Sequence, residues 1–226
     1  MTEHGTASAV AHQFDDLEQQ REAGSLGMWL FLITEIMFFG GMFTAYAVYR
    51  YAYYNAFIEG SSHLNVPLGA ANTVVLIVSS LTMALAVHAA QRGKKKAMVA
   101  WLALTIVLGG AFLGVKVVEY KDKYDHGLIP GALWNPKHEG GVAPPAEMQL
   151  FFSLYFAMTG MHALHMVIGI GIMLALMRMA LRGRFSPEYY APVEVSGLYW
   201  HFVDIVWIFL FPLLYLIGLH VVKGHG

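Results

Sequence analysis

Three ionisable residues interrupt or border the last apolar stretch of the chain. His201 and Asp204 lie three residues apart near the middle of the run Val195–Val222, and Glu194 comes one heptad before His201. At helical pitch these spacings place all three residues on one side of a helix. A histidine beside a carboxylate permits two kinds of chemistry: a hydrogen-bonded pair that joins helices, or a group that takes up and releases protons.

Other apolar stretches carry polar residues at a similar depth. Glu35 is the only charged residue in the first stretch, and His162 and His165 form an i, i+3 pair in the fourth. Counted at helical rise, Glu35, Asp204 and these histidines fall in one layer, roughly 15 Å from one end. We therefore expect the partner of Glu35 to come from the fourth or fifth stretch. The residues expected to pack between helices or against lipid are Asn72, Ser79, Ser80, Thr159, Trp200 and Trp207.

The histidines raise the question of a metal site. His162, His165 and His201 together with one carboxylate would satisfy the ligand count of a transition metal. The same residues also serve to bridge helices through hydrogen bonds where water is absent. The chain has no cysteine, which excludes disulfides, iron–sulfur clusters, covalent haem attachment and thiolate copper sites. We expect no metal and no cofactor bound by this chain, apart from phospholipid.

The composition places these residues in a membrane. Of the 226 residues 57% are hydrophobic and only 13% are charged, and the mean hydropathy is +0.53. A soluble domain averages about 45–50% apolar residues, and no soluble core of this size would bury so much apolar surface. The net charge of −1 gives no reason to expect nucleic acid as a partner.

The sequence predicts an all-α membrane protein, a bundle of five transmembrane helices. Apolar runs of roughly 20 residues or more are long enough to cross a bilayer. The predicted spans are about 26–49, 68–90, 97–115, 148–177 and 195–222. They form one transmembrane domain, 25–222, between a polar tail, 1–24, and a short C-terminal tail, 223–226. The first tail has no apolar centre or small-residue cleavage site and is not read as a signal peptide.

Basic residues predict the orientation of the bundle. The connections Gln91–Lys96 and Arg178–Arg184 hold seven of the fourteen lysines and arginines, whereas the connection 52–67 holds none. Positively charged short loops stay on the cytoplasmic side. The N-terminus is therefore predicted to be cytoplasmic and the C-terminus periplasmic.

Small residues and one long connection bear on packing. Gly110 and Gly114 form a GxxxG pair, and similar small pairs in other spans would let helix backbones approach closely. The connection from Lys121 to Glu147 is rich in glycine and proline, so we expect little regular structure there. Its length and mixed charges suit contact with a neighbouring extracytoplasmic domain or with an electron-donor partner.

In these motifs the chain resembles subunit III of the haem–copper respiratory oxidases, above all that of cytochrome c oxidase. The resemblance spans about 25–220, with motifs in order on all five spans. The motifs are Leu26–Phe39 with its buried Glu35, Asn72–Leu76 followed by Ser79 and Ser80, Glu119–Tyr120, Ala157–Gly169 with its two histidines, Glu194, and Tyr199–Trp207.

The sequence departs from the family pattern in three places. The full form of the family has seven helices, and this chain lacks the first two, which form one arm of a lipid-holding cleft. Lys116 stands where the family usually has glutamine, and we expect its side chain to snorkel outward. The connection 121–147 is longer than usual.

The resemblance implies a membrane subunit of a proton-pumping terminal oxidase in a bacterial cytoplasmic membrane. Haem and copper would lie in partner subunits, subunit I being the main contact, with subunit II, other oxidase subunits, lipids and a respiratory supercomplex as further partners. The implied role is to stabilise the large haem subunit and support proton uptake. Glutamate at position 35 favours a cytochrome c enzyme. The alternatives are a ubiquinol oxidase, a nitric oxide reductase system and an independent proton channel or transporter.

Overall fold

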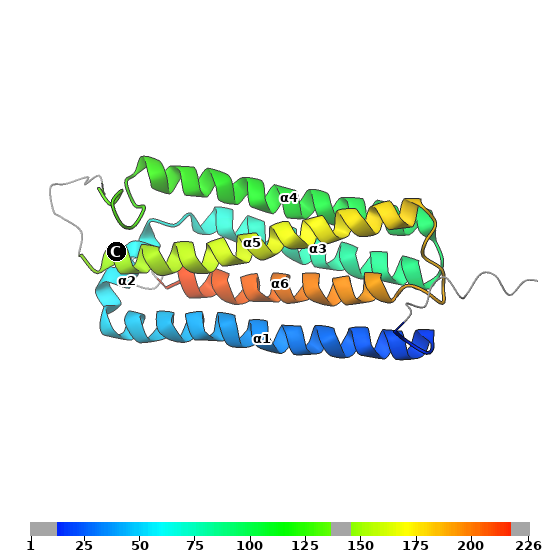
Figure 1. Cartoon of the computed structure of the whole chain (residues 1–226). Helices are drawn as coiled ribbons and strands as arrows, with labels where there is room; N and C mark the ends of the chain where they lie inside the picture. The colour runs from blue at the N-terminus through cyan, green and yellow to red at the C-terminus, as the bar shows by residue number, and fades with distance from the viewer. Residues whose placement is uncertain (1–12, 137–145, 218–226) are drawn as a thin grey trace, which may run out of the picture.

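A computed structural model describes residues 13–136 and 146–217 of the chain. Five long helices run side by side along the molecule, and one short helix caps an end (Figure 1). The helices are α1 (Leu17–Ala52), α2 (Tyr54–Ser62), α3 (Val66–Gln91), α4 (Lys95–Asp125), α5 (Met148–Leu181) and α6 (Ala191–Tyr215). All but α2 are long and apolar enough to cross a membrane. The predicted all-helical architecture, with five helices long and apolar enough to span a membrane, is confirmed for the described residues.

Local sequence features begin and end these helices. Asp16 and Asn65 cap α1 and α3, because each side chain accepts a hydrogen bond from a backbone N–H three residues on. A glycine with positive φ stands at the second position after the last residue of α3, α4 and α5. Backbone hydrogen bonds reach back from these glycines and from the residues after them, as in a Schellman motif.

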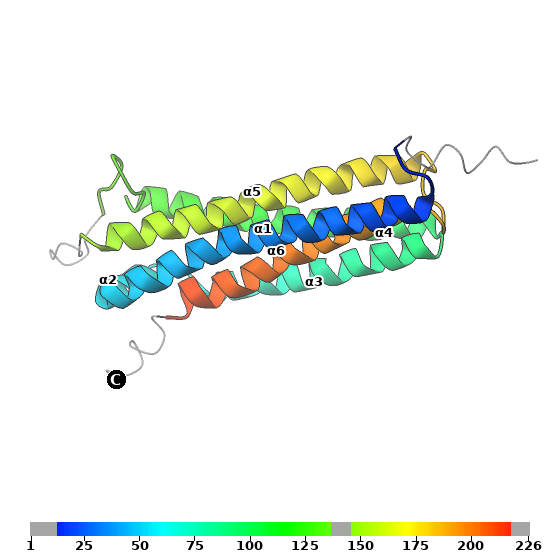
Figure 2. The same cartoon turned by 60° about the horizontal axis from the view of Figure 1, so that its bottom comes forward.

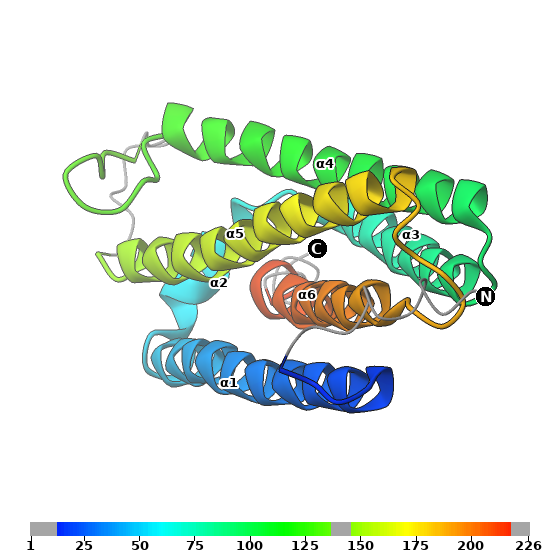
Figure 3. The ribbon, with the colours of Figure 1, turned by 45° about the vertical axis from the view of Figure 1, so that its right-hand side comes forward.

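Helix α6 occupies the centre of the bundle. It contacts α1 on one side and α3 and α5 on the other, while α4 packs against α3 and α5 (Figure 3). Its two buried tryptophans fix this position. Trp200 lies against Gly109 of α4 and Gly169 of α5, where a Cβ atom would come within 2.8 Å of the indole ring. Its Nε1 donates to Ser79 of α3, and Trp207 donates likewise to Thr73.

Helix α1 is held by a narrow seam. Among its described residues only Leu32, Phe39 and Tyr46 are buried, and their spacing of seven is that of a coiled-coil contact line. The Tyr46 hydroxyl donates to the Leu213 carbonyl oxygen at 2.8 Å. That carbonyl lies in the last turn of α6, where the helix itself offers no partner. Much of α1 therefore faces outward.

The basic connections gather at one end of the molecule. The start of α1 lies beside the α3–α4 and α5–α6 connections, and α2 and the residues after α4 lie at the opposite end (Figure 2). This arrangement follows from five antiparallel passes. It groups the basic loops with the beginning of α1, as the sequence predicts.

The helices extend beyond the predicted apolar spans. Helix α1 begins at Leu17, inside the stretch expected to be a polar tail, and α4 continues to Asp125, ten residues past its predicted span. The short helix α2 was not predicted. Helix formation continues past the apolar run wherever caps and i, i+4 hydrogen bonds allow it, so hydropathy gives the span and not the helix end. Residues 137–145 and 218–226 lie outside the described residues.

Candidate functional site

Glu35 of α1 pairs with His165 of α5. The Glu35 Oε2 and His165 Nε2 atoms are 3.2 Å apart, and the side chains are 17% and 10% exposed. The other ring nitrogen, Nδ1, lies 2.8 Å from the Met161 carbonyl oxygen. Because a carbonyl only accepts, Nδ1 carries a proton. With Nε2 unprotonated, Glu35 Oε2 accepts no hydrogen bond, and one further proton on either partner would allow one to form. The predicted origin of the Glu35 partner in the fourth or fifth span is confirmed.

Of the three ionisable residues of α6, His201 and Asp204 face α3 beside Ser80, whereas Glu194 faces the start of α1. The His201 Nδ1 atom lies 2.7 Å from the Ser80 hydroxyl of α3. Glu194 forms an ion pair with Arg21 at the start of α1, at 3.4 Å. Asp204 is 2% exposed, and neither of its carboxyl oxygens has a hydrogen-bond partner. His201 thus joins α6 to α3 and is not hydrogen-bonded to Asp204.

His162 faces the core between α4 and α6. Its ring lies 5.4 Å from the Phe112 ring and 5.2 Å from the Trp207 ring, between centroids. Neither ring nitrogen has a hydrogen-bond partner. Thr159, one turn earlier, is hydrogen-bonded to Tyr120 of α4 at 2.5 Å. The two histidines therefore serve different interfaces.

Asn72 completes the interior polar layer on α3. Its amide nitrogen donates to the Phe112 carbonyl oxygen at 3.3 Å, joining α3 to α4. Each predicted polar residue thus lies between helices. In the described part of the chain no three His, Asp or Glu side chains gather as a metal would need, because His162, His165 and His201 face different neighbours.

A buried ion pair lies where the sequence led us to expect an outward lysine. Lys116 of α4 is 3% exposed, and its Nζ atom donates to Glu119 Oε2 at 2.8 Å. It also donates to the hydroxyls of Tyr155 of α5 and Tyr215 of α6, at 3.1 and 3.0 Å. Tyr215 in turn donates to the second Glu119 oxygen at 2.5 Å.

The prediction that Lys116 snorkels outward is therefore wrong. A carboxylate one turn away and two tyrosine hydroxyls satisfy the ammonium inside the bundle, and they offset the loss of its hydration. Aromatic rings surround it as well, with four ring centroids between 5.1 and 5.6 Å from Nζ. The i, i+3 spacing of Lys116 and Glu119 was the sequence feature that could have revealed this pair.

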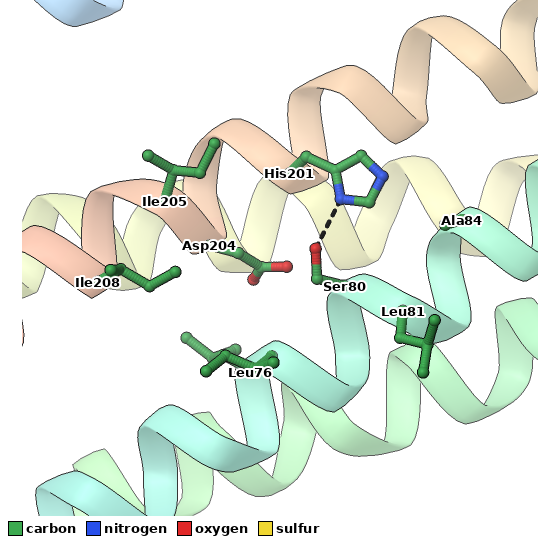
Figure 4. A pocket seen from close by; sticks show the side chains of 9 residues that line it. Leu76, Ser80, Leu81, Ala84, His201, Asp204, Ile205 and Ile208 are labelled. Atoms are coloured by element: carbon green, nitrogen blue, oxygen red, sulfur yellow. Dashed lines mark hydrogen bonds between the residues drawn. The ribbon is translucent and has the colours of Figure 1, made fainter.

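A cavity of about 380 Å³ opens between α3 and α6 beside Asp204. Leucine, isoleucine and alanine side chains line most of it, and Ser80, His201 and Asp204 contribute its polar groups (Figure 4). A second, entirely apolar groove of about 220 Å³ lies between α1 and α6, lined by residues such as Phe39, Phe43 and Phe209.

The chain is similar to known respiratory proteins over nearly its whole length. The family model "Cytochrome c oxidase subunit III" matches residues 15–125 and 146–219. The unmatched stretch, 126–145, falls in the connection expected to depart from the family.

Relatives of both oxidase types are found. The cytochrome c oxidase subunit 3 of Corynebacterium diphtheriae is 35% identical, over 85% of this chain and 87% of its own. That of Thermostichus vulcanus is 33% identical over 94% of each chain. The quinol oxidase subunit 3 of Bacillus subtilis is 32% identical over 96% of this chain and 97% of its own.

Proposed function

Because the chain belongs to the cytochrome c oxidase subunit III family, we propose that it stabilises the large haem subunit of a terminal oxidase and supports its uptake of protons. The oxidase passes electrons from cytochrome c to oxygen, and haem and copper reside in partner subunits. Subunit I is the main contact, and subunit II and further oxidase subunits complete the assembly.

The Glu35–His165 pair carries the proton part of the proposal. Two titratable groups, from α1 and α5, lie 3.2 Å apart, and the His165 ring is oriented by the contact of its Nδ1 with the Met161 carbonyl oxygen. Both lie in the middle of their helices, where an unpaired charge would be costly. A pair that holds one proton in either of two positions can accept and pass it on with little movement. A purely structural hydrogen bond would need no titratable partner.

Replacing Glu35 by glutamine separates these roles. The glutamine amide donates to His165 Nε2, so the contact between α1 and α5 survives while the titration is lost. We expect the E35Q oxidase to assemble normally and to turn over more slowly than wild type as pH rises, when protons become scarce. A wild-type pH–rate profile together with a loosened subunit in E35A would leave Glu35 with a structural role alone.

The proposed orientation has the beginning of α1 in the cytoplasm and the end of α6 in the periplasm. Its support is the grouping of the basic connections at one end of the bundle. The absence of cysteine allows a direct test with single cysteines. In intact cells an impermeant maleimide should label E59C, between α1 and α3, and reach K94C only after the membrane is opened. The reverse pattern would invert the orientation.

Cytochrome c as electron donor and phospholipid as ligand are the remaining parts of the proposal. Glu35 favours the cytochrome c enzymes, while relatives of both types exist. The purified complex should oxidise reduced cytochrome c; oxidation of quinol in its place would reassign the donor. The apolar groove between α1 and α6 fits an acyl chain, so extraction of the washed complex should recover phospholipid, and substitution of Gly40 by leucine should lower its amount.

A further inference from the structure

Asp204 is a buried acid whose carboxyl group has few hydrogen-bond donors within reach in this chain. The side chain is 2% exposed, and neither carboxyl oxygen accepts a well-formed hydrogen bond. The neighbouring Ser80 hydroxyl has a single proton to donate and also lies 2.7 Å from His201 Nδ1, so a hydrogen bond from Ser80 to Asp204 still leaves most acceptor sites of the carboxyl group unused. Figure 4 shows the carboxyl group pointing from α6 toward Ser80, beside the cavity that both residues line. A buried polar group left without a partner destabilises the structure that contains it.

The position of Asp204 limits what supplies the partner. Asp204 is the fourteenth of the 25 residues of α6, so it lies roughly 20 Å from the start of the helix. Lipid headgroups and bulk water meet the helix ends and not this level. A hydrogen-bond donor at mid-membrane depth is most simply a side chain of another transmembrane helix.

The rim of the cavity has the shape that helix packing uses. Ser80 and Ala84 are one turn apart on α3, and small residues at this spacing let a second helix approach closely. Around them stand exposed apolar side chains: Ile77, Leu81, Ile205 and Ile208, at 52%, 59%, 50% and 45% exposure. The cavity between α3 and α6 thus has small residues and exposed apolar residues along its rim and an acid at its base. This combination suits one apolar helix that carries a single polar residue.

We infer that the cavity between α3 and α6 receives a transmembrane helix of another oxidase subunit. A hydroxyl, amide, indole or guanidinium group of that helix forms a hydrogen bond with the cluster of Asp204, Ser80 and His201. The inference rests on the proposed function, because it assigns the face through which this chain joins its complex. It places the contact on α3 and α6, and it leaves the outer face of α5 to lipid.

Photo-cross-linking in the assembled oxidase tests the assignment. A benzophenone amino acid replaces Leu81, on the rim of this cavity, or Leu174 of α5, which is similarly exposed at 51%. Irradiation of native membranes should join position 81 to a transmembrane segment of another oxidase subunit, identified by mass spectrometry. Position 174 should yield lipid adducts alone.

Two substitutions, each with a control variant, link the cross-link to the cavity between α3 and α6. D204L removes the acid and should weaken retention of the chain by roughly tenfold or more in a detergent titration, the factor of one charge-assisted hydrogen bond. D204N keeps hydrogen-bonding capacity and should retain the cross-link. A84L fills the rim and should abolish the cross-link from position 81. A175L adds the same volume to the exposed face of α5, at a similar distance from the helix end, and should leave the cross-link intact.

The outcomes separate this inference from the proposed function. A chain that never copurifies with the haem subunit overturns the proposed function. A chain that copurifies but cross-links from position 174, or yields only lipid or quinone adducts at position 81, overturns the docking face. Equal retention of D204L and wild type overturns the role of the acid.

Discussion

The buried ion pair between Lys116 and Glu119 makes a sharp prediction about the stability of the bundle. Both residues belong to α4, and each side chain is 4% exposed. The pair reaches Tyr155 and Tyr215, so one ammonium connects α4 with α5 and α6. Two substitutions probe it: K116M, which keeps an apolar stem of similar length, and E119Q, which keeps the shape of the carboxylate.

Removing one member of a buried pair leaves the other charge uncompensated, at a cost of about 3–5 kcal/mol. K116M should reach this range, since Glu119 keeps only the hydrogen bond from Tyr215. E119Q should cost less, about 2–3 kcal/mol, because each aromatic ring facing the ammonium contributes about 0.5–2 kcal/mol. The double variant contains neither of these two buried charges and should lose only about 1–2 kcal/mol.

Thermal unfolding of the detergent-solubilised chain, followed by tryptophan emission, measures the cycle. For a chain of this size 1 kcal/mol shifts Tm by about 2–4 °C, so K116M should lower Tm by about 6–20 °C. The double variant should melt above K116M. The control is K121M, which removes an exposed lysine of the same helix and should change stability by less than about 0.5 kcal/mol. Additive losses in the double variant would refute the view that the two charges compensate each other.

Two further perturbations test packing and charge. In G169A the new Cβ would lie 2.8 Å from the Trp200 ring, so we expect the variant to lose about 1–3 kcal/mol of stability. The control G171A, with open space at its Cβ, should gain up to about 1 kcal/mol of stability. Equal melting temperatures of the two variants would contradict the packing argument. Burial, with a contribution from Lys123, lowers the pKa of His63 at the end of α2 below 6.5. As pH falls through about 6.5, the unfolded chain therefore protonates this histidine before the folded chain does, which favours unfolding. H63Q should then lose less stability than wild type between pH 7.5 and 5.5. Parallel stability–pH profiles of the two proteins would exclude His63 as a cause of the acid destabilisation.

The sequence is sufficient for the span count because a bilayer imposes a length. Each long helix contains an apolar run that few charges interrupt, and such runs have no stable place outside a membrane or a large core. The level of Glu35 follows from the same arithmetic, since helical rise converts residue number into depth. A partner from α5 or α6 was therefore predictable, although the choice of α5, and of His165 over His162, was not.

Which face of a helix meets a neighbour was less predictable. Gly110 and Gly114 of α4 have open space around the position of a Cβ, whereas Gly109, next to the first of them, holds the Trp200 ring. The GxxxG spacing shows that a close approach is allowed on a face, and tertiary packing decides whether that face is used. The large side chain opposite decides the outcome here, and periodicity says nothing about it.

The role of a buried polar residue is shown better by its hydrogen-bond partners than by its residue type. Lys116 donates a hydrogen bond to Glu119, and Glu35 faces an oppositely charged or titratable partner, His165, at 3.2 Å. His162 has no hydrogen-bond partner, but aromatic rings enclose it and leave no access for a neighbouring subunit. Asp204 differs from both kinds, because it combines a missing partner with a place at the wall of an open cavity. An acid in that position is either a cost that the isolated chain bears or half of a contact that the complex completes. The second view explains why the cost persists, because a hydrogen bond made only on assembly favours the bound subunit over the free one.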